Sequence, residues 1–294
     1  ALLDHAVTLD PTWSRTFLIR GDLRHRTGQA KLAVADYKRA QELDPENIES
    51  LLALGDAQAE AGETETAIRT FSRAAKLHPN HGWVYVYRAD AFADSQKHTE
   101  ALNDYRRAVL LLPGHAEPRL NRGHLLLRLG KAEEATKDYE WVARQFPDRS
   151  EALCGLAEAH WQTGKVRDAL AYYDRALATG LRDVAVLLGR AEACAATGRR
   201  AEAIQDCTKA GEIDPQNASI FSMRAGLHLE SGDLEAAEAD VARALALDPK
   251  LADAFLNQAD LRLRQGDPRA AAAAYQAALQ QSPEDFGTLV RWIR

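Results

Sequence analysis

The sequence predicts an all-α chain that repeats one helix-turn-helix unit along its length, and a fixed proline spacing is the main observation behind this prediction. Steps of 34 residues forward from Pro11 end on proline seven times out of eight, and only Leu181 breaks the series. Glycine and alanine recur at two other fixed points of the same period. A constant period of this length is typical of an array in which one supersecondary unit stacks on the next. The prolines are Pro45, Pro79, Pro113, Pro147, Pro215, Pro249 and Pro283.

A frame set at Ser14 divides residues 14–285 into eight units of 34 residues, which we number repeats 1 to 8. The repeats start at Ser14, Ile48, Gly82, Ala116, Ser150, Val184, Ala218 and Ala252. Residues 1–13 fit only the second half of such a unit, so we expect them to be the second-helix remnant of a preceding repeat. Because the chain also starts without a methionine, we expect it to be part of a longer protein. Residues 286–294 begin a ninth first helix, which we interpret as a terminal cap or a truncated helix.

Residue size along the repeat predicts how its two helices pack. A small residue at the eighth position lets the helices approach closely, and alanine at the twentieth position is expected to face it. Glycine at the fifteenth position can adopt the left-handed conformation that ends a helix. A large residue at the twenty-fourth position is expected to pack toward the next repeat, and proline at the thirty-second ends the second helix. Repeat 3 has Gln96 in place of the turn glycine, so we expect its turn to adopt another geometry.

An arginine and an aspartate vary together across the repeats. The arginine stands at the seventh position and the aspartate at the twenty-third, and three repeats lack both. This correlation predicts an ion pair between the two helices of one repeat; chance or recent duplication is the alternative explanation. The pairs are Arg20 with Asp36, Arg88 with Asp104, Arg122 with Asp138, Arg190 with Asp206, and Arg224 with Asp240.

The order of small, glycine, alanine, aromatic and proline positions resembles the tetratricopeptide repeat family over residues 14–285. The resemblance implies a right-handed superhelical solenoid of eight repeats, in which the first helix of each repeat lines a concave groove. It also implies that the groove is formed by the second, fifth, sixth, ninth, twelfth and thirteenth positions of each repeat, and that the groove binds a protein or a peptide.

Composition and charge exclude several classes of protein. A net charge of −6 and a pI near 5.9 argue against nucleic-acid binding, which needs clustered lysine and arginine. No apolar run is long enough to suggest membrane insertion. The three cysteines, Cys154, Cys194 and Cys207, form no even or CxxC pattern and indicate free thiols in a reducing compartment. We therefore expect a cytoplasmic protein.

The chain contains no pattern of catalytic residues. Gly130-Lys131 and Gly164-Lys165 lack the rest of a phosphate-binding loop, and neither GxSxG nor HExxH occurs. His78 and His81 are close in sequence, but no further metal ligands accompany them, and we interpret both as loop residues. Cys154 is expected in the groove without a histidine to activate it. We expect no enzyme activity, no cofactor and no metal.

The expected groove is acidic and partly aromatic. Aromatic residues beside charge are typical of anchor sites for partners, and repeat 3 places Trp83 and Tyr87 in this setting. We also expect Asn121 to hydrogen-bond a peptide backbone. The alternatives are that the acids form an ordinary solvated face and that Trp83 packs on its neighbouring repeat. The candidate groove residues are Trp83, Tyr87, Asp90, Asp94, Leu120, Asn121, His124, Glu158 and Trp161.

These residues predict a scaffold or adaptor that binds an extended basic or mixed peptide segment. Some family members bind acidic chaperone tails through Lys and Asn at the fifth and ninth positions, and this chain has no such clamp. An alternative is a sensory or substrate-selecting region of a larger regulator or enzyme. Self-association through the repeat ends is a third possibility.

Overall fold

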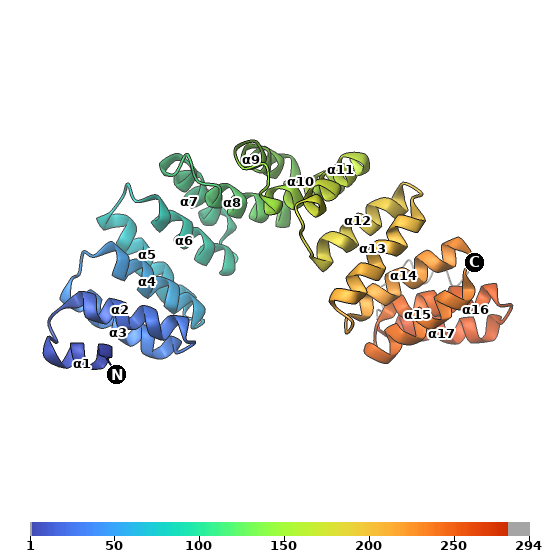
Figure 1. Ribbon diagram of the computed structural model, residues 1–294, viewed down its shortest axis with the longest axis horizontal. Helices are drawn as coiled ribbons and strands as arrows, with labels where there is room; N and C mark the ends of the chain where they lie inside the picture. The colour runs from blue at the N-terminus through green and yellow to red at the C-terminus, as the bar shows by residue number, and fades with distance from the viewer. Residues whose placement is uncertain (1, 282–294) are drawn as a thin grey trace. The chain divides into compact units, whose positions relative to one another are not determined.

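The computed structural model describes residues 2–281, and the expected terminal helix at residues 286–294 lies outside them. The described residues form α-helices joined by short turns and contain no strand, so the all-α prediction is confirmed (Figure 1). The helices are α1 Leu2–Leu9, α2 Ser14–Arg26, α3 Ala30–Leu43, α4 Ile48–Glu60, α5 Thr64–Leu77, α6 Gly82–Asp94, α7 His98–Leu111, α8 Glu117–Arg128, α9 Ala132–Gln145, α10 Ser150–Gln162, α11 Val166–Ala178, α12 Val184–Ala196, α13 Arg200–Ile213, α14 Ala218–Ser231, α15 Leu234–Leu247, α16 Ala252–Arg264 and α17 Pro268–Gln281.

The described residues divide into two compact parts, residues 2–142 and residues 143–281. Within each part, an even-numbered helix from α2 onward pairs with the odd-numbered helix that follows it, and the next pair stacks on this hairpin. The even-numbered helices are the first helices of the expected repeats. Second helices end two residues before the periodic proline, as α3 does before Pro45. Where Leu181 replaces proline, α11 ends earlier, at Ala178, and Gly180 adopts a φ of 87°.

In repeats 1, 2 and 4, the glycine of the first helix packs directly against an aromatic ring of the second helix. A Cβ atom on Gly55 would lie 2.4 Å from Cε1 of Phe71, and Gly21 and Gly123 face the rings of Tyr37 and Tyr139 in the same way. The nearest atoms to these glycines therefore belong to the ring at the twenty-fourth position, while the alanines at the twentieth position, such as Ala33 and Ala67, are fully buried. The same ring reaches the next repeat, since Phe71 stacks on Tyr87 with ring centroids 5.8 Å apart.

All five predicted arginine–aspartate pairs are present. Each arginine donates from Nε and one Nη to the two carboxylate oxygens of its aspartate, at distances of 2.5 to 3.0 Å. Each aspartate side chain is buried, and that of Asp206 is 0% exposed. Such two-point contacts fix the guanidinium plane as well as its charge. The pairs therefore hold the first and second helices of a repeat in one relative orientation.

Two of these paired arginines, Arg190 and Arg20, also contact the second helix that precedes their own repeat. Nη1 of Arg190 lies 2.7 Å from Oδ1 of Asp174 on α11, the second helix of the preceding repeat. Nη1 of Arg20 makes the same contact with Oδ1 of Asp4 on α1, at 3.0 Å. Both aspartates lie 16 residues before their arginine. This shared register supports the prediction that α1 is a second helix.

Left-handed glycines end the first helices, with one exception. Gly62 has a φ of 80°, and its turn is closed by the Glu63 N–H donating to the Gln58 carbonyl at 2.8 Å. In repeat 3, Gln96 adopts a φ of 59°, and the Lys97 N–H donates to the Phe92 carbonyl at 2.8 Å. The expectation of a different turn was wrong, because the hydrogen bonds of the hairpin impose the left-handed conformation on a glutamine.

Two substitutions at these turn positions should change the free energy of unfolding in opposite directions. A non-glycine residue in the left-handed region costs about 1 kcal/mol. We therefore expect Gln96→Gly to raise the free energy of unfolding by about 1 kcal/mol and Gly62→Ala to lower it by about the same amount. Equilibrium urea denaturation measures both. A Gln96→Gly variant less stable than the parent would contradict this explanation.

Candidate functional site

The nine candidate groove residues fall in both parts of the chain. Those from Trp83 to His124 lie on α6 and α8, in the first part, whereas Glu158 and Trp161 lie on α10, in the second part. Within each group, residues that are three or four positions apart lie on the same face of their helix.

Asp90 is the centre of the first group. Its carboxylate accepts a short hydrogen bond from the Tyr105 hydroxyl and a second from Nδ2 of Asn121 at 3.1 Å. Burial raises the pKa of the Asp90 carboxyl, while the two hydrogen bonds partly offset this effect. Asn121 thus already uses one of its amide N–H groups within the protein. The hydrogen bond between Asp90 and Asn121 joins α6 of repeat 3 to α8 of repeat 4.

The Tyr105–Asp90 contact recurs elsewhere. The Tyr37 hydroxyl donates to Oδ1 of Asp22 at 2.9 Å, and the Tyr275 hydroxyl donates to Oδ1 of Asp260 at 2.7 Å. In each case the tyrosine is at the twenty-fourth position and the acid at the ninth. Burial raises the pKa of Tyr37 and of Tyr105, so both phenols stay neutral.

Sequence reasoning missed these tyrosine–acid pairs, although a signal was present. Five repeats have tyrosine at the twenty-fourth position, and four of them have an acid at the ninth. The fifth has His124, whose ring centroid lies 5.7 Å from that of Tyr139 in a tilted contact. This signal is weaker than that of the arginine–aspartate pairs, because Asp56 and Glu192 are acids at the ninth position of repeats that lack the tyrosine.

Exposure separates the other residues of the first group. Asp94 and His124 are exposed, and Trp83 and Tyr87 are half-buried. The Trp83 ring meets the His115 ring edge-on, with centroids 5.4 Å apart, and Tyr87 stacks on Phe71. Leu120 is only 4% exposed, so it belongs to the core and not to a contact surface. This burial contradicts the selection of Leu120 as a groove residue.

The second group is less open. Glu158 is half-buried and accepts a hydrogen bond from Nε2 of Gln162 at 2.9 Å. Trp161 is half-buried and packs against the hydrophobic core of α10 to α14. Trp161 therefore contributes to the core of the second part and leaves only part of its side chain open to a partner.

Each part is hollowed at the expected groove positions. In the first part, a cavity of about 300 Å³ is lined by Asp22, Asp56, Tyr37 and Tyr87, among others. In the second part, a cavity of about 520 Å³ is lined by Glu192, Asp253, Met223 and Leu256, among others. Both linings combine carboxylates with apolar side chains. Tyr87 is the candidate groove residue that lines the first cavity.

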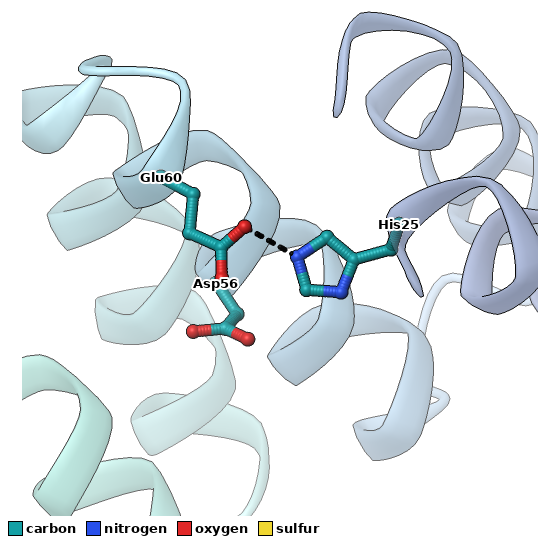
Figure 2. Close-up of side chains that lie close together, drawn as sticks. All are labelled: His25, Asp56 and Glu60. Atoms are coloured by element: carbon teal, nitrogen blue, oxygen red, sulfur yellow. Dashed lines mark hydrogen bonds and ion pairs between the residues drawn. The ribbon is translucent and has the colours of Figure 1, made fainter. Parts of the chain in front are cut away.

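The described residues offer little nucleophilic chemistry. Burial raises the pKa of the Cys154 thiol to about 11 and that of Cys207 to about 12, so both thiols are protonated near neutral pH. Nε2–H of His78 donates to the Glu46 carbonyl, at 2.7 Å. One cluster, His25, Asp56 and Glu60, brings three side chains of metal-ligating type within 4.8 Å of one another (Figure 2). Sequence reasoning did not find this cluster, because its members come from two repeats.

No helix among residues 2–281 combines the length and the apolar character needed to cross a bilayer.

The chain belongs to the tetratricopeptide repeat family. A family model described as tetratricopeptide repeat matches residues 52–116, 120–180, 154–218 and 222–286, and a second, described as TPR repeat, matches residues 21–62. No curated protein sequence matches the chain. Proteins with this fold serve generally as scaffolds for protein–protein interaction.

Solved structures agree in fold. The chain is similar to a chain of the Cut9–Hcn1 hetero-tetramer of the APC/C, with a TM-score of 0.64 and 17% identity over 99% of this chain and 58% of that one. It spans little more than half the length of that relative. It is also similar to Pseudomonas aeruginosa pilF (TM-score 0.64, 21% identity, 72% of this chain and 97% of that one). YrrB, described as a TPR protein with an unusual peptide-binding site, matches with a TM-score of 0.55 and 17% identity over 65% of this chain and 98% of YrrB.

Proposed function

We propose that the chain is a scaffold or adaptor that binds an extended, basic or mixed peptide segment of a partner protein on the first helices of its repeats. The observation that supports this proposal most strongly is the charged hollow in each part, lined by carboxylates and apolar side chains at the groove positions. The similar protein YrrB is described as having a peptide-binding site, which makes peptide binding a reasonable use of this fold.

Acidic residues outnumber basic ones at the groove positions of both parts. A surface of one sign concentrates ligands of the opposite sign and speeds their association. In the first part the acids are Asp22, Glu49, Asp56, Glu60, Asp90, Asp94 and Glu117, against Arg15, Arg26 and Arg128. In the second they are Glu151, Glu158, Glu192, Glu230, Asp253 and Asp260, against Arg264.

The half-buried aromatic residues supply the apolar component of the proposed contact. Tyr87 combines an apolar ring held by Phe71 with a hydroxyl that can hydrogen-bond a peptide. Trp83 lies one helical turn before it on the same helix. A peptide that alternates basic and apolar residues would match this combination of carboxylates and rings.

A charge reversal confined to exposed acids tests the proposal. Asp90 is unsuitable because its carboxylate is part of the Tyr105 and Asn121 network, whereas Glu49 and Asp94 are exposed. We expect a fluorescent peptide of alternating lysine and leucine to bind the parent chain, and to bind at least about tenfold more weakly to Glu49→Lys/Asp94→Lys, because two carboxylates at groove positions of the first part become cations. Fluorescence anisotropy, repeated at rising salt concentrations, measures the affinity of each chain for the peptide.

The matched control is Glu133→Lys/Glu134→Lys, which makes the same change in net charge on exposed residues of α9, a second helix. Because charges farther than about 8 Å are largely screened at physiological salt, the control should retain most of the affinity. Equal losses in both variants would indicate a nonspecific charge effect and would reject the groove as the binding surface.

A further inference from the structure

His25, Asp56 and Glu60 converge from two neighbouring repeats. His25 lies in the last turn of α2, and its Nε2 is 2.6 Å from Oε2 of Glu60 on α4 (Figure 2). Asp56 lies four residues before Glu60, so both carboxylates are on one face of α4. One ligand atom from each of the three side chains lies within 4.8 Å of the others. All three are held by helices, which limits their movement.

Asp56 is the unusual member of this cluster. Asp22, at the same position of repeat 1, accepts a hydrogen bond from Tyr37, but repeat 2 has Phe71 where that tyrosine would stand. Phe71 has no hydroxyl, and within residues 2–281 no donor makes a hydrogen bond to the Asp56 carboxylate. Burial and the nearby Glu60 raise the pKa of Asp56, while His25 lowers it. A half-buried carboxylate beside an imidazole thus has coordination capacity that the protein does not use.

The space beside the cluster admits a small ligand. The cavity of about 300 Å³ in the first part is lined by His25 and Asp56, with Asp22 and Arg26 also on its wall. Asp22 adds a further negative charge, and Arg26 opposes it. The carboxylates Asp22, Asp56 and Glu60 together outnumber the one arginine, so a cation is favoured over an anion.

We propose that His25, Asp56 and Glu60 bind a divalent transition-metal ion of the zinc class. One imidazole nitrogen with two carboxylate oxygens is a donor set that suits Zn²⁺ and its first-row neighbours, whereas Ca²⁺ and Mg²⁺ prefer oxygen ligands alone. Water from the cavity would complete the coordination. The ion would join α2 to α4 and so stabilise the contact between repeats 1 and 2.

The combination occurs once in the array. A histidine at the twelfth position of one repeat must precede acids at the ninth and thirteenth positions of the next, and only repeats 1 and 2 meet this condition. Repeat 3 has the two acids, Asp90 and Asp94, but Ala59 stands at the twelfth position before them. This natural counterpart supplies a matched control, because its acids have the same register without the histidine.

Isothermal titration of the metal-free chain with Zn²⁺ tests the proposal. We expect one saturable site per chain, a rise in melting temperature with Zn²⁺, and an affinity lowered at least about tenfold in both His25→Gln and Asp56→Asn. The control Asp94→Asn should bind Zn²⁺ as the parent does. Circular dichroism of each variant checks that the helices remain.

Two results would overturn the proposal. The first is an absence of saturable Zn²⁺ binding by the parent chain, which would leave His25 and Glu60 as an ordinary surface ion pair. The second is unchanged Zn²⁺ affinity in His25→Gln, which would place the ion elsewhere. The cysteines are weak competitors near neutral pH because burial raises the pKa of their thiols.

Discussion

Arg190→Leu is expected to lower the free energy of unfolding by about 3–5 kcal/mol, because it leaves the carboxylate of Asp206 buried without its partner. Asp206 is 0% exposed, and both of its oxygens accept hydrogen bonds from Arg190. Taking a charge out of water is costly, and only the paired guanidinium offsets this cost. Urea denaturation followed by circular dichroism measures the loss.

The array itself suggests the compensating change. Repeat 2 has Leu54 and Thr70 at these two positions, and the Thr70 hydroxyl instead donates to Oε1 of Gln58 at 2.7 Å. We therefore expect Arg190→Leu/Asp206→Thr to be more stable than Arg190→Leu alone. Arg199→Ala is the control, because its pair with Glu202 is exposed and its loss should change stability little. Equal losses in the single and double variants would refute a buried ion pair at this place.

The second large effect is expected at the contact between Gly55 and Phe71. Phe71 is 1% exposed, so Phe71→Ala should lower the free energy of unfolding by about 3–5 kcal/mol by leaving a cavity. Gly55→Ala should also destabilise the parent chain, because the new Cβ would lie 2.4 Å from Cε1 of Phe71. In the Phe71→Ala background the same Gly55→Ala change should stabilise, since the clash is gone and alanine favours the helix by about 1 kcal/mol.

Gly226, which has free space for a Cβ atom beside its Cα atom, is the control for this reversal in the effect of a glycine-to-alanine substitution on stability. A Cβ on Gly226 would find its nearest neighbour, Oδ1 of Asn257, at an ordinary 3.5 Å. Gly226→Ala should therefore stabilise the parent chain by about 1 kcal/mol through helix propensity alone. If Gly55→Ala has the same effect in both backgrounds, the ring does not fill the space next to Gly55.

The repeat made much of the fold predictable from sequence. Each position is sampled eight times, so a pair such as Arg122 and Asp138 is visible as a correlation before any contact is known. The turn glycines and the helix ends before proline follow from backbone sterics, which depend on local sequence. These features need only the neighbouring residues or the neighbouring helix.

The parts that sequence did not predict depend on three-dimensional context. Gln96 adopts a left-handed conformation because its hairpin requires it, although glutamine does not favour that conformation. Leu120 occupies a groove position by number, yet packing buries it. His25 meets Asp56 and Glu60 only because α2 and α4 stack, and no single repeat contains all three. Position within a repeat therefore locates a residue on a face but does not determine its exposure or its partners.

Capture of partners from native lysate tests the proposed binding surface most directly. The parent chain, Glu49→Lys/Asp94→Lys and Glu133→Lys/Glu134→Lys would be immobilised side by side, and the retained proteins identified by mass spectrometry. We predict proteins with basic, extended segments that are retained by the parent and by the α9 control but lost from the groove variant. Identical sets of proteins on all three chains would contradict binding by the first helices.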